Sequence, residues 1–487
     1  MSVNHVDRPS PSPTGPTRVS MLLLFEIGLG LALAVVTMTL LALPMPYLAF
    51  GIIPPIAALL LFKIIRSPEY AYYLIIALIP LNAWRVITEQ YPTVTISKLL
   101  GIFVVIVLFW RLIVNPEETI RYRLGIWRPL LLFVLVGLVS ALFSAWRLES
   151  FDNLRMLVQS IVFMGLTIYF VREKELTTVV PFVIVLSAAF SAGFAIYGSL
   201  YHIPGLTLAV SQTGGGSMTR ALGLSTDPNF FAAMILCSIP LLAYFFFNTR
   251  RRHVKAATLL LFVLNSYAIV LSYSRAVTLI FLATLLLIVF EYARKIRFLH
   301  LGFVILLLLP LGVVTAWKLP QSKMFARMMT LKNSRVDESL MRRRSYLTVA
   351  GQAFYAHPVL GSGPGTFLKV YSKSPYAAAY TPEAEGFYRV AHNTFLEVLV
   401  GTGLVGFAFF LILIFIALKY FYVAQKIFRK IPAGVPPECV RAFLYSFLSL
   451  LMSLLFLSDL YLKYLWLHLG IAAVVYHLAR QAQKEGA

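Results

Sequence analysis

Apolar runs close to twenty residues long recur along this chain and constrain its fold more than any other feature. A helix of that length crosses the roughly 30 Å hydrocarbon core of a bilayer. Lipid offers no partners to backbone polar groups, so only helices and closed barrels span it, and continuous rather than alternating runs favour helices. We therefore predict an all-α polytopic membrane protein with about 12 to 14 transmembrane helices. The runs lie near residues 21–43, 46–65, 69–87, 97–114, 127–146, 152–171, 177–200, 227–247, 256–273, 275–293, 298–317, 393–421, 440–460 and 464–480.

Composition excludes a soluble protein and, through the distribution of charge, a nucleic-acid partner. The chain is 59% hydrophobic and 13% charged, against about 25% charged in globular domains. Its net charge of +22 could indicate nucleic acid. With a cytoplasmic amino terminus, however, basic clusters at 248–255, 291–298 and 426–430 all fall on the cytoplasmic side. The charge therefore sets topology, and membrane lipids are the expected surroundings.

We predict four parts along the chain. Residues 1–20 are rich in proline and serine and read as a disordered cytoplasmic tail. Residues 21–317 carry the first eleven spans, 318–391 form one long outer segment, and 392–487 hold the last helices. The two cysteines, Cys237 and Cys439, lie in a span and on the cytoplasmic side, so we expect neither a disulfide nor a thiolate metal site.

The outer segment 318–391 is too long for an ordinary connection, and its aromatic content and helical pattern predict a folded element. Asp337 fits the cap of a helix that Pro358 ends. Four residues are predicted to share its apolar face: Leu340, Leu347, Ala350 and Phe354. The run GSGPG at 361–365 follows no strand and lacks a Lys-Ser/Thr ending, so a glycine turn is favoured over a phosphate-binding loop.

Arginines gather on the outer side, where topology keeps them scarce. The residues concerned are Arg220, Arg275 and, in the long segment, Arg342, Arg343 and Arg344. One interpretation is that they snorkel or bind lipid headgroups. The other is a diphosphate ligand, because guanidinium groups bind phosphate oxygens in pairs. Asp227 and Pro228 predict a helix start beside Arg220, and such a terminus favours anions.

The stretch RVAHNTFLEVLVGTGLVGF at 389–407 places an ionisable ring at the mouth of an apolar helix. At 100° per residue, one narrow stripe is predicted to hold His392, Leu396, Leu399, Gly403 and Gly406. The glycines would admit a neighbouring helix closely. An imidazole there can act as a general base, or it can be a structural cap. Asn393 and Glu397 are expected to stabilise the helix entrance.

The run HNTFLEVLVGTGLVG fits a His-Asn-x9-Gly-x-x-Gly pattern and resembles the O-antigen ligases and related polysaccharide polymerases. The resemblance continues through MTRALGLSTDPNF, the SRA segment and SLMRRRSYLTVAGQAFYAHPVLGSGPGTF, covering about residues 215–407. The chain departs from the family by its extra predicted spans and by Ala276, where many members have glycine.

This resemblance implies a bacterial inner-membrane glycosyltransferase of GT-C-like architecture whose active site faces the periplasm. The donor would be an undecaprenyl-diphosphate-linked glycan, used without metal or cofactor. His392 would be the catalytic base, and Arg220 and Arg275 would hold the diphosphate, together with Arg343 and Arg344 of the long segment. Lipid A core, a second lipid-linked repeat and a protein hydroxyl all remain open as acceptors. A lipid-linked glycan flippase is the alternative, although repeated halves and a charged central cavity are not apparent in the sequence.

Overall fold

The computed structural model describes residues 67–81, 96–114, 125–211, 217–293, 338–380, 389–431 and 434–485. The chain divides into two compact units, residues 1–70 and 71–487, and of the first only 67–70 are described. The predicted tail 1–20, the predicted spans near 21–43, 46–65 and 298–317, and Asp337 lie outside the described residues. The predicted division at 318–391 therefore stays a prediction.

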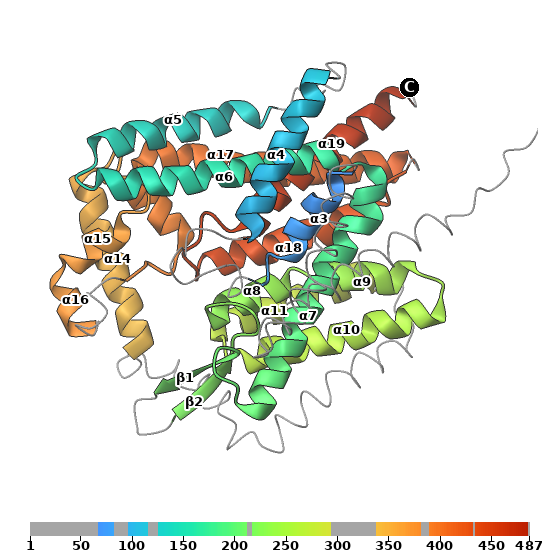
Figure 1. Cartoon of the computed structure of the whole chain (residues 1–487), viewed down its shortest axis with the longest axis horizontal. Helices are drawn as coiled ribbons and strands as arrows, with labels where there is room; N and C mark the ends of the chain where they lie inside the picture. The colour runs from blue at the N-terminus through green and yellow to red at the C-terminus, as the bar shows by residue number, and fades with distance from the viewer. Residues whose placement is uncertain are drawn as a thin grey trace, which may run out of the picture. The chain divides into compact units, whose positions relative to one another are not determined.

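Helices make up nearly all of the described chain (Figure 1), which confirms the predicted all-α membrane protein. Within the described residues, seven helical segments are long and apolar enough to span a membrane. The helices are α3 (Glu69–Ala77), α4 (Ile96–Val114), α5 (Trp127–Phe143), α6 (Arg147–Phe170), the π-helical turn η3 (Glu175–Val179), α7 (Val180–Tyr201), α8 (Pro228–Leu236), α9 (Ile239–Asn248), α10 (Arg252–Leu271), α11 (Arg275–Tyr292), α14 (Glu338–Ala356), α15 (Phe367–Ser372), α16 (Pro375–Tyr380), α17 (Thr394–Lys430), α18 (Pro437–Leu454) and α19 (Lys463–Glu485).

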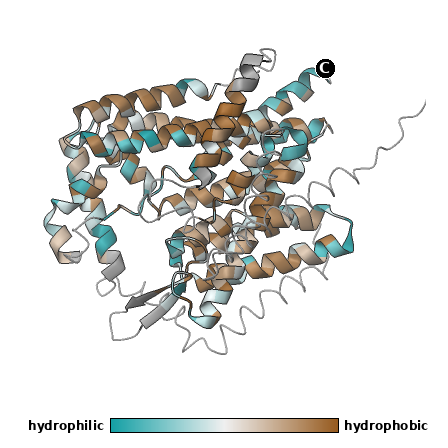
Figure 2. Ribbon diagram, in the orientation of Figure 1, coloured by the Kyte–Doolittle hydropathy of each residue, from teal (hydrophilic) through white to brown (hydrophobic). Residues whose placement is uncertain are grey.

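Hydrophobic residues occupy most of the length of the helices, and hydrophilic ones lie mainly near their ends (Figure 2). Phe290 on α11 and Phe415 on α17 are 84% and 67% exposed, as lipid-facing residues of a membrane bundle would be. Helices distant in sequence pack together: α17 against α5 and α19, and α19 against α6. Phe133 and Phe410 join α5 to α17 with ring centroids 5.8 Å apart.

Several predicted spans have different ends in the structure. The run expected near 227–247 is interrupted at Cys237 and Ser238, because Pro240 has no amide hydrogen and its ring crowds the preceding turn. Helix α3 ends at Ala77 rather than at 87. Helix α17 continues to Lys430, past the predicted 421. Helix α18 ends at Leu454, which leaves residues 455–462 as a connector to α19.

One β-hairpin departs from the all-helical expectation. Strands β1 (Thr207–Ser211) and β2 (Ser217–Ala221) pair antiparallel, with Leu208 opposite Arg220. Arg220 lies one residue before the end of β2. The hairpin therefore holds a predicted site residue on a short, rigid element.

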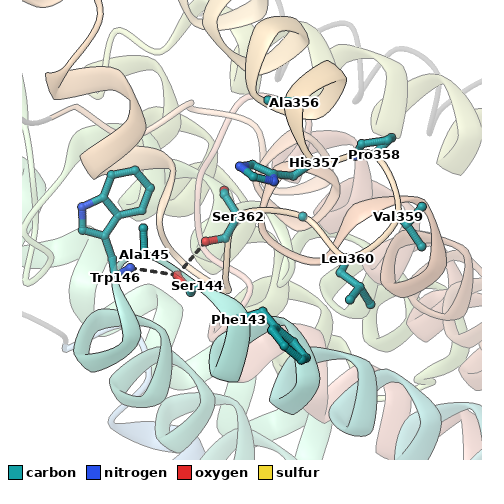
Figure 3. A pocket seen from close by; sticks show the side chains of 11 residues that line it. Phe143, Ser144, Ala145, Trp146, Ala356, His357, Pro358, Val359, Leu360 and Ser362 are labelled. Carbon is teal, nitrogen blue, oxygen red and sulfur yellow. Dashed lines mark hydrogen bonds between the residues drawn. The ribbon is translucent and has the colours of Figure 1, made fainter.

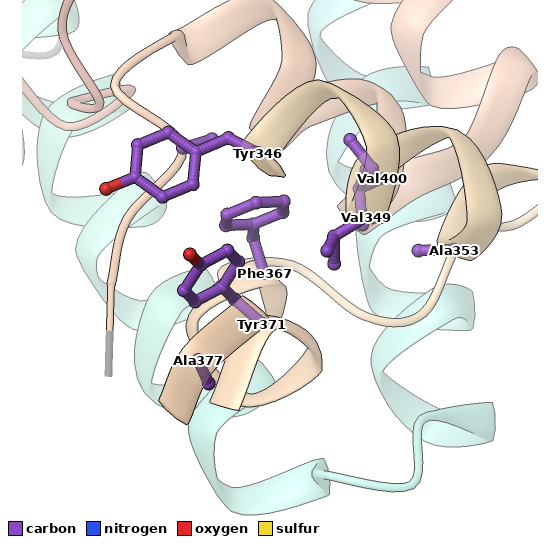
Figure 4. Packing of buried hydrophobic residues seen from close by; sticks show 9 residues of the cluster. Tyr346, Val349, Ala353, Phe367, Tyr371, Ala377 and Val400 are labelled. Atoms are coloured by element: carbon purple, nitrogen blue, oxygen red, sulfur yellow. The ribbon is translucent and has the colours of Figure 1, made fainter. Parts of the chain in front are cut away.

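The buried face of α14 differs from the predicted one. Leu347 is 58% exposed and Phe354 only half-buried, although Ala350 is buried as expected. The buried apolar residues are Tyr346, Val349, Ala350 and Ala353. They pack on Phe367 and Tyr371 of α15 (Figure 4), and Tyr346 meets Tyr371 edge to face at 5.0 Å. The sequence pattern could not select this face, because the partner aromatic residues come from a later helix.

Candidate active site

His392 lies just before α17 and not on it. The helix begins at Thr394, and Asn393 caps it by accepting the Leu396 N–H at 3.0 Å. His392 itself has φ of 50°, a left-handed conformation that is uncommon outside glycine. The predicted helical stripe is therefore wrong at His392, because the chain leaves the helical path at the Asn393 cap. Strain of this kind concentrates at functional sites.

The backbone on both sides of His392 is held by hydrogen bonds. The Ala391 N–H donates to Glu397 Oε1 at 2.9 Å, and the Asn393 N–H donates to Ser458 Oγ at 3.2 Å. Next along the chain, Thr394 Oγ1 donates to the Leu457 carbonyl at 2.6 Å. These contacts confirm that Asn393 and Glu397 stabilise the helix entrance. The 455–462 connector supplies the other half of the support.

Charged side chains from three further segments act on the His392 ring. Burial lowers its pKa, Asp227 at the start of α8 opposes that shift, and Arg343, Arg389 and Arg342 reinforce it. The ring also lies 6.0 Å from that of Tyr346 on α14. The half-buried imidazole is thus surrounded mainly by positive charge. That environment suits a base working beside an anion.

The predicted arginines of α14 are not equivalent. Arg343 is half-buried, influences His392, and lies over the Phe456 ring at 5.4 Å. Arg344 is exposed and is not among the groups that shift the His392 pKa. Arg342, also half-buried, does act on His392. One residue along a helix is a rotation of about 100°, which separates Arg344 from its neighbours.

Arg220, on β2, connects to α8 and to the turn before α11. Its side chain is buried, Nε donates to the Ser272 carbonyl at 2.8 Å, and Nη2 donates to Asn229 Oδ1 at 2.9 Å. Ser272 belongs to the turn before α11, whose first residue is Arg275. The fold thereby brings the two predicted diphosphate ligands, Arg220 and Arg275, to one turn. The sequence alone predicts only that Arg220 and Arg275 lie on the same side of the membrane.

The predicted helix start beside Arg220 is confirmed. Asp227 Oδ1 accepts the Asn229 N–H at 2.7 Å and the Phe230 N–H at 3.0 Å, and Pro228 is the first residue of α8. A capping carboxylate of this kind is the expected occupant of a helix amino terminus. Asp227 also influences the pKa of His392, and no local sequence pattern indicates that additional role.

The glycine-rich run 361–365 is a turn, as predicted, and it packs on a break in α17. Gly403 has φ of 64° and ψ of −169°, which opens the helix. Ser362 and Gly363 donate backbone N–H bonds to the Val400 and Gly401 carbonyls at 2.9 and 3.0 Å. The Leu404 N–H in turn donates to the Pro358 carbonyl at 2.8 Å. These two loop amides are therefore engaged with α17 and not placed to cradle a phosphate.

The two glycines predicted to support helix packing have different neighbours. A Cβ on Gly403 would collide with the backbone of Val359 and Leu360, so its close partner is a loop segment rather than a helix. A Cβ on Gly406 would meet Thr402 of its own helix and, at 3.3 Å, Val136 of α5. The second half of the predicted stripe is thus also divided by the break.

Part of the chain matches a known protein family. Residues 260–411 match the family model Wzy_C, described as O-antigen ligase. This match supports a place in the O-antigen ligase and polymerase superfamily. No protein with a curated description matches the chain. The matched part holds Arg275, α14 and His392, whereas Arg220 and the 455–462 connector lie outside it.

The candidate site brings together an imidazole and several arginines. A lowered pKa keeps the His392 ring neutral near pH 7, the form that can accept a proton. Arginine side chains bind phosphate oxygens with directed N–H groups. Sequence reasoning assigned no site role to Arg389, Asp227 or Ser458, and the only sequence signal for Asp227 was its helix cap.

Proposed function

We propose that this protein is an extracytoplasmic glycosyltransferase that moves or polymerises a glycan from an undecaprenyl-diphosphate-linked donor onto an acceptor hydroxyl. The observation that carries the proposal is the neutral-favouring environment of His392 beside Arg342, Arg343 and Arg389. A base and a set of cations are the two groups that this transfer requires. The family match supports the reaction class, and the donor and the periplasmic location are our own inferences.

The reaction we propose is a single displacement. His392 takes the proton from the acceptor hydroxyl as its oxygen attacks the anomeric carbon of the donor sugar. The bond from that carbon to the diphosphate oxygen breaks, and its electron pair leaves with the lipid diphosphate. In-line attack inverts the anomeric configuration. The proton on His392 then passes to solvent or to the departing phosphate.

Arginines supply the electrostatic part of this mechanism. A diphosphate is already a good leaving group, so cations that neutralise its growing charge suffice without a proton donor. Arg275 and Arg343 are the candidates for direct contact, and Arg220 sets the position of the turn that precedes Arg275. We expect turnover to continue in EDTA, because guanidinium groups would take the role that a divalent metal plays in many sugar transferases.

The decisive experiment uses the full chain in nanodiscs with a lipid-linked oligosaccharide donor. Wild-type protein should release lipid diphosphate and form an inverted product with one of three acceptors: lipid A core, a second lipid-linked repeat, or a protein hydroxyl. His392→Ala should slow this release by about 10² to 10⁴. A protein that moves donor between leaflets without cleaving it, in wild type and His392→Ala alike, would instead be the flippase.

Topology can be tested separately on α15. A cysteine at Ser372, which is half-buried near the end of that helix, should react with an impermeant thiol reagent in intact spheroplasts. The two natural cysteines are buried and give little background. Labelling that requires lysis would place the candidate site on the cytoplasmic side and contradict the proposal.

A further inference from the structure

Both backbone amides that flank His392 lead to one carboxyl group. The Ala391 N–H reaches Glu397 directly, and the Asn393 N–H reaches Ser458 Oγ. The Ser458 hydroxyl also interacts with the Glu397 carboxyl group, since it acts on the pKa of that carboxyl. A serine hydroxyl has one hydrogen. Since Ser458 Oγ accepts from Asn393, its hydrogen is directed to Glu397, and the carboxyl group receives both arms.

These hydrogen bonds hold the backbone of His392, the one residue between Ala391 and Asn393. A left-handed conformation at His392 persists only where the surroundings hold it. The two arms come from different segments, because Glu397 lies on the first turn of α17 and Ser458 on the α18–α19 connector. Thr394 adds a third link to that connector through the Leu457 carbonyl. The ring of His392 is thus aimed by groups that do not touch it.

We propose that Glu397 and Ser458 are positioning residues that set the orientation of the His392 imidazole. The inference rests on the proposed function of His392 as the base. Loss of either arm would let the 391–393 backbone relax out of the left-handed conformation. A misplacement of about 1 Å can reduce turnover on the order of 100-fold. The effect should fall on kcat, since neither residue belongs to the arginine group around the ring.

Ser458 gives the cleaner test, because Glu397→Ala risks misfolding. Ser458→Ala should lower kcat for glycan transfer at least about tenfold while the donor KM stays within about twofold. Ser458→Thr keeps the hydroxyl and should restore most of the rate. Ser449→Ala is the matched control. Ser449 carries a buried hydroxyl on α18 that bonds Thr284 of α11, and it lies before the connector that holds Ser458.

The outcomes separate this inference from the proposed function. If His392→Ala is inactive but Ser458→Ala and Glu397→Gln both turn over at the wild-type rate with a lowered Tm, the pair is merely structural and the inference fails. Failure of Thr to rescue Ser458 would also overturn it. If His392→Ala retains activity, the proposed function fails first, whatever Ser458 does.

A second and independent feature is a cavity of about 390 Å³ at the turn between α5 and α6 (Figure 3). It lies at the carboxyl-terminal end of α14, whereas Arg342 and Arg343 lie near the amino-terminal end of that helix. The residues around it are Phe143, Ser144, Ala145, Trp146, Ala356, His357, Pro358, Val359, Leu360, Gly361 and Ser362. The Ser144 hydroxyl donates to the Ser362 backbone carbonyl at 2.7 Å, which leaves a mostly apolar wall.

The position and exposure of this cavity fit the membrane–water interface. Phe143 ends α5 and is 78% exposed, and Val359 across the cavity is 58% exposed. Helix α6, which starts at Arg147, is one of the candidate membrane spans. Trp146, between them, is a residue type that favours the headgroup level of a bilayer. An acyl chain would cover the exposed phenyl and isopropyl groups.

A lysine lies beside the cavity. Lys373 Nζ lies 4.9 Å from the centre of the Trp146 ring, and the His357 side chain lies on the cavity wall. The nearby carboxylate of Glu149 is paired with Lys369 at 3.1 Å. No carboxylate is among the residues around this cavity. We infer that it binds an anionic phospholipid, with the acyl chain against Phe143 and Val359 and the phosphate near Lys373.

Tryptophan quenching by brominated phospholipids tests this site. The chain has six tryptophans, so the signal is the difference between wild type and Trp146→Phe. One basic residue near the headgroup should make brominated phosphatidylglycerol quench this difference signal at an about fivefold lower mole fraction than brominated phosphatidylcholine. Lys373→Gln should remove the preference. Lys255→Gln is the matched control, another lysine over an aromatic ring, Phe246 at 5.7 Å.

Equal quenching by the two lipids in wild-type protein would reduce the cavity to ordinary lipid contact and overturn the inference. A difference signal that does not respond to either lipid would overturn it as well. Displacement of the brominated phospholipid by lipid A core, but not by an added anionic phospholipid, would assign the cavity to the acceptor instead.

Discussion

Helix α17 departs from regular geometry at two places, and the two are held in different ways. At its mouth, residues 391–394 are fixed by side chains, namely the Glu397 carboxyl, the Ser458 hydroxyl and the Thr394 hydroxyl. At its break, Gly403 and the turn 358–363 are fixed by backbone bonds between the two segments. Arginines and an aspartate influence the mouth. The hydrogen bonds that close the break involve no ionisable side chain.

This difference separates the parts of the molecule that can do chemistry from those that maintain the fold. A break in a membrane helix leaves backbone groups that lipid cannot satisfy, and the loop 358–363 satisfies them. Ser140 of α5 adds a bond to the Gly401 carbonyl at 2.8 Å. At the mouth, the same helix instead holds an ionisable ring in a strained conformation. The comparison predicts that mutations at the mouth affect rate and mutations at the break affect stability.

The largest effect is expected at His392. His392→Ala should reduce glycan transfer by about 10² to 10⁴, the usual contribution of a general base, because the variant lacks the imidazole that accepts the hydroxyl proton. Donor binding and Tm should change little, since the ring is only half-buried. Transfer assays and thermal melts on the same preparation give both numbers. An early-melting variant with normal specific activity would make His392 a structural residue.

The opposite pattern is expected at Gly403. Gly403→Ala should destabilise the fold by about 3 kcal/mol or more, because a Cβ would collide with the Val359 backbone and the φ of 64° disfavours alanine. The rate per folded molecule should remain near wild type. Gly351→Ala on α14 is the control, because nothing lies within 4 Å of its Cβ position and alanine favours helix by about 1 kcal/mol. Equal melting of the two variants would contradict the comparison.

Arg220 should show an intermediate behaviour, because it is both buried and close to the site. Arg220→Ala leaves the Ser272 carbonyl and Asn229 Oδ1 without their partner, at a cost on the order of 2 kcal/mol in stability, and raises the donor KM by displacing Arg275. Arg220→Lys should recover only part of either loss, since an ammonium cannot reproduce the two-pronged contact. Unchanged donor KM in a correctly folded Arg220→Ala protein would remove Arg220 from the site.

The smallest expected effect is a shift of the pH–rate profile. The neutral ring is the active form, so the rate rises as pH rises through the pKa of His392, which burial holds below its ordinary value. Asp227 raises that pKa, so Asp227→Asn, which keeps a good helix cap, should move the acidic limb to lower pH. Arg343→Gln should move it to higher pH. Arg155→Gln, which breaks an exposed pair with Asp152, is the control.

The sequence by itself determined features whose causes lie within a few residues. Apolar length located the spans, Asp227 and Pro228 located the start of α8, and the glycines of 361–365 located a turn. Each depends on local backbone physics, namely a cap bond to a nearby amide or the freedom of glycine to adopt positive φ.

Only the tertiary structure decided what these local features face. The N–H of Asn393 finds its partner Ser458 65 positions along the chain, and Arg220 reaches Ser272 52 positions away. Helical periodicity predicted His392 on the helix, because a periodic pattern carries no information about the turn that the chain makes at the Asn393 cap. Contacts with α15 likewise determine which face of α14 is buried. Pairings between distant segments leave no periodic signal in either one, and they set the position of His392.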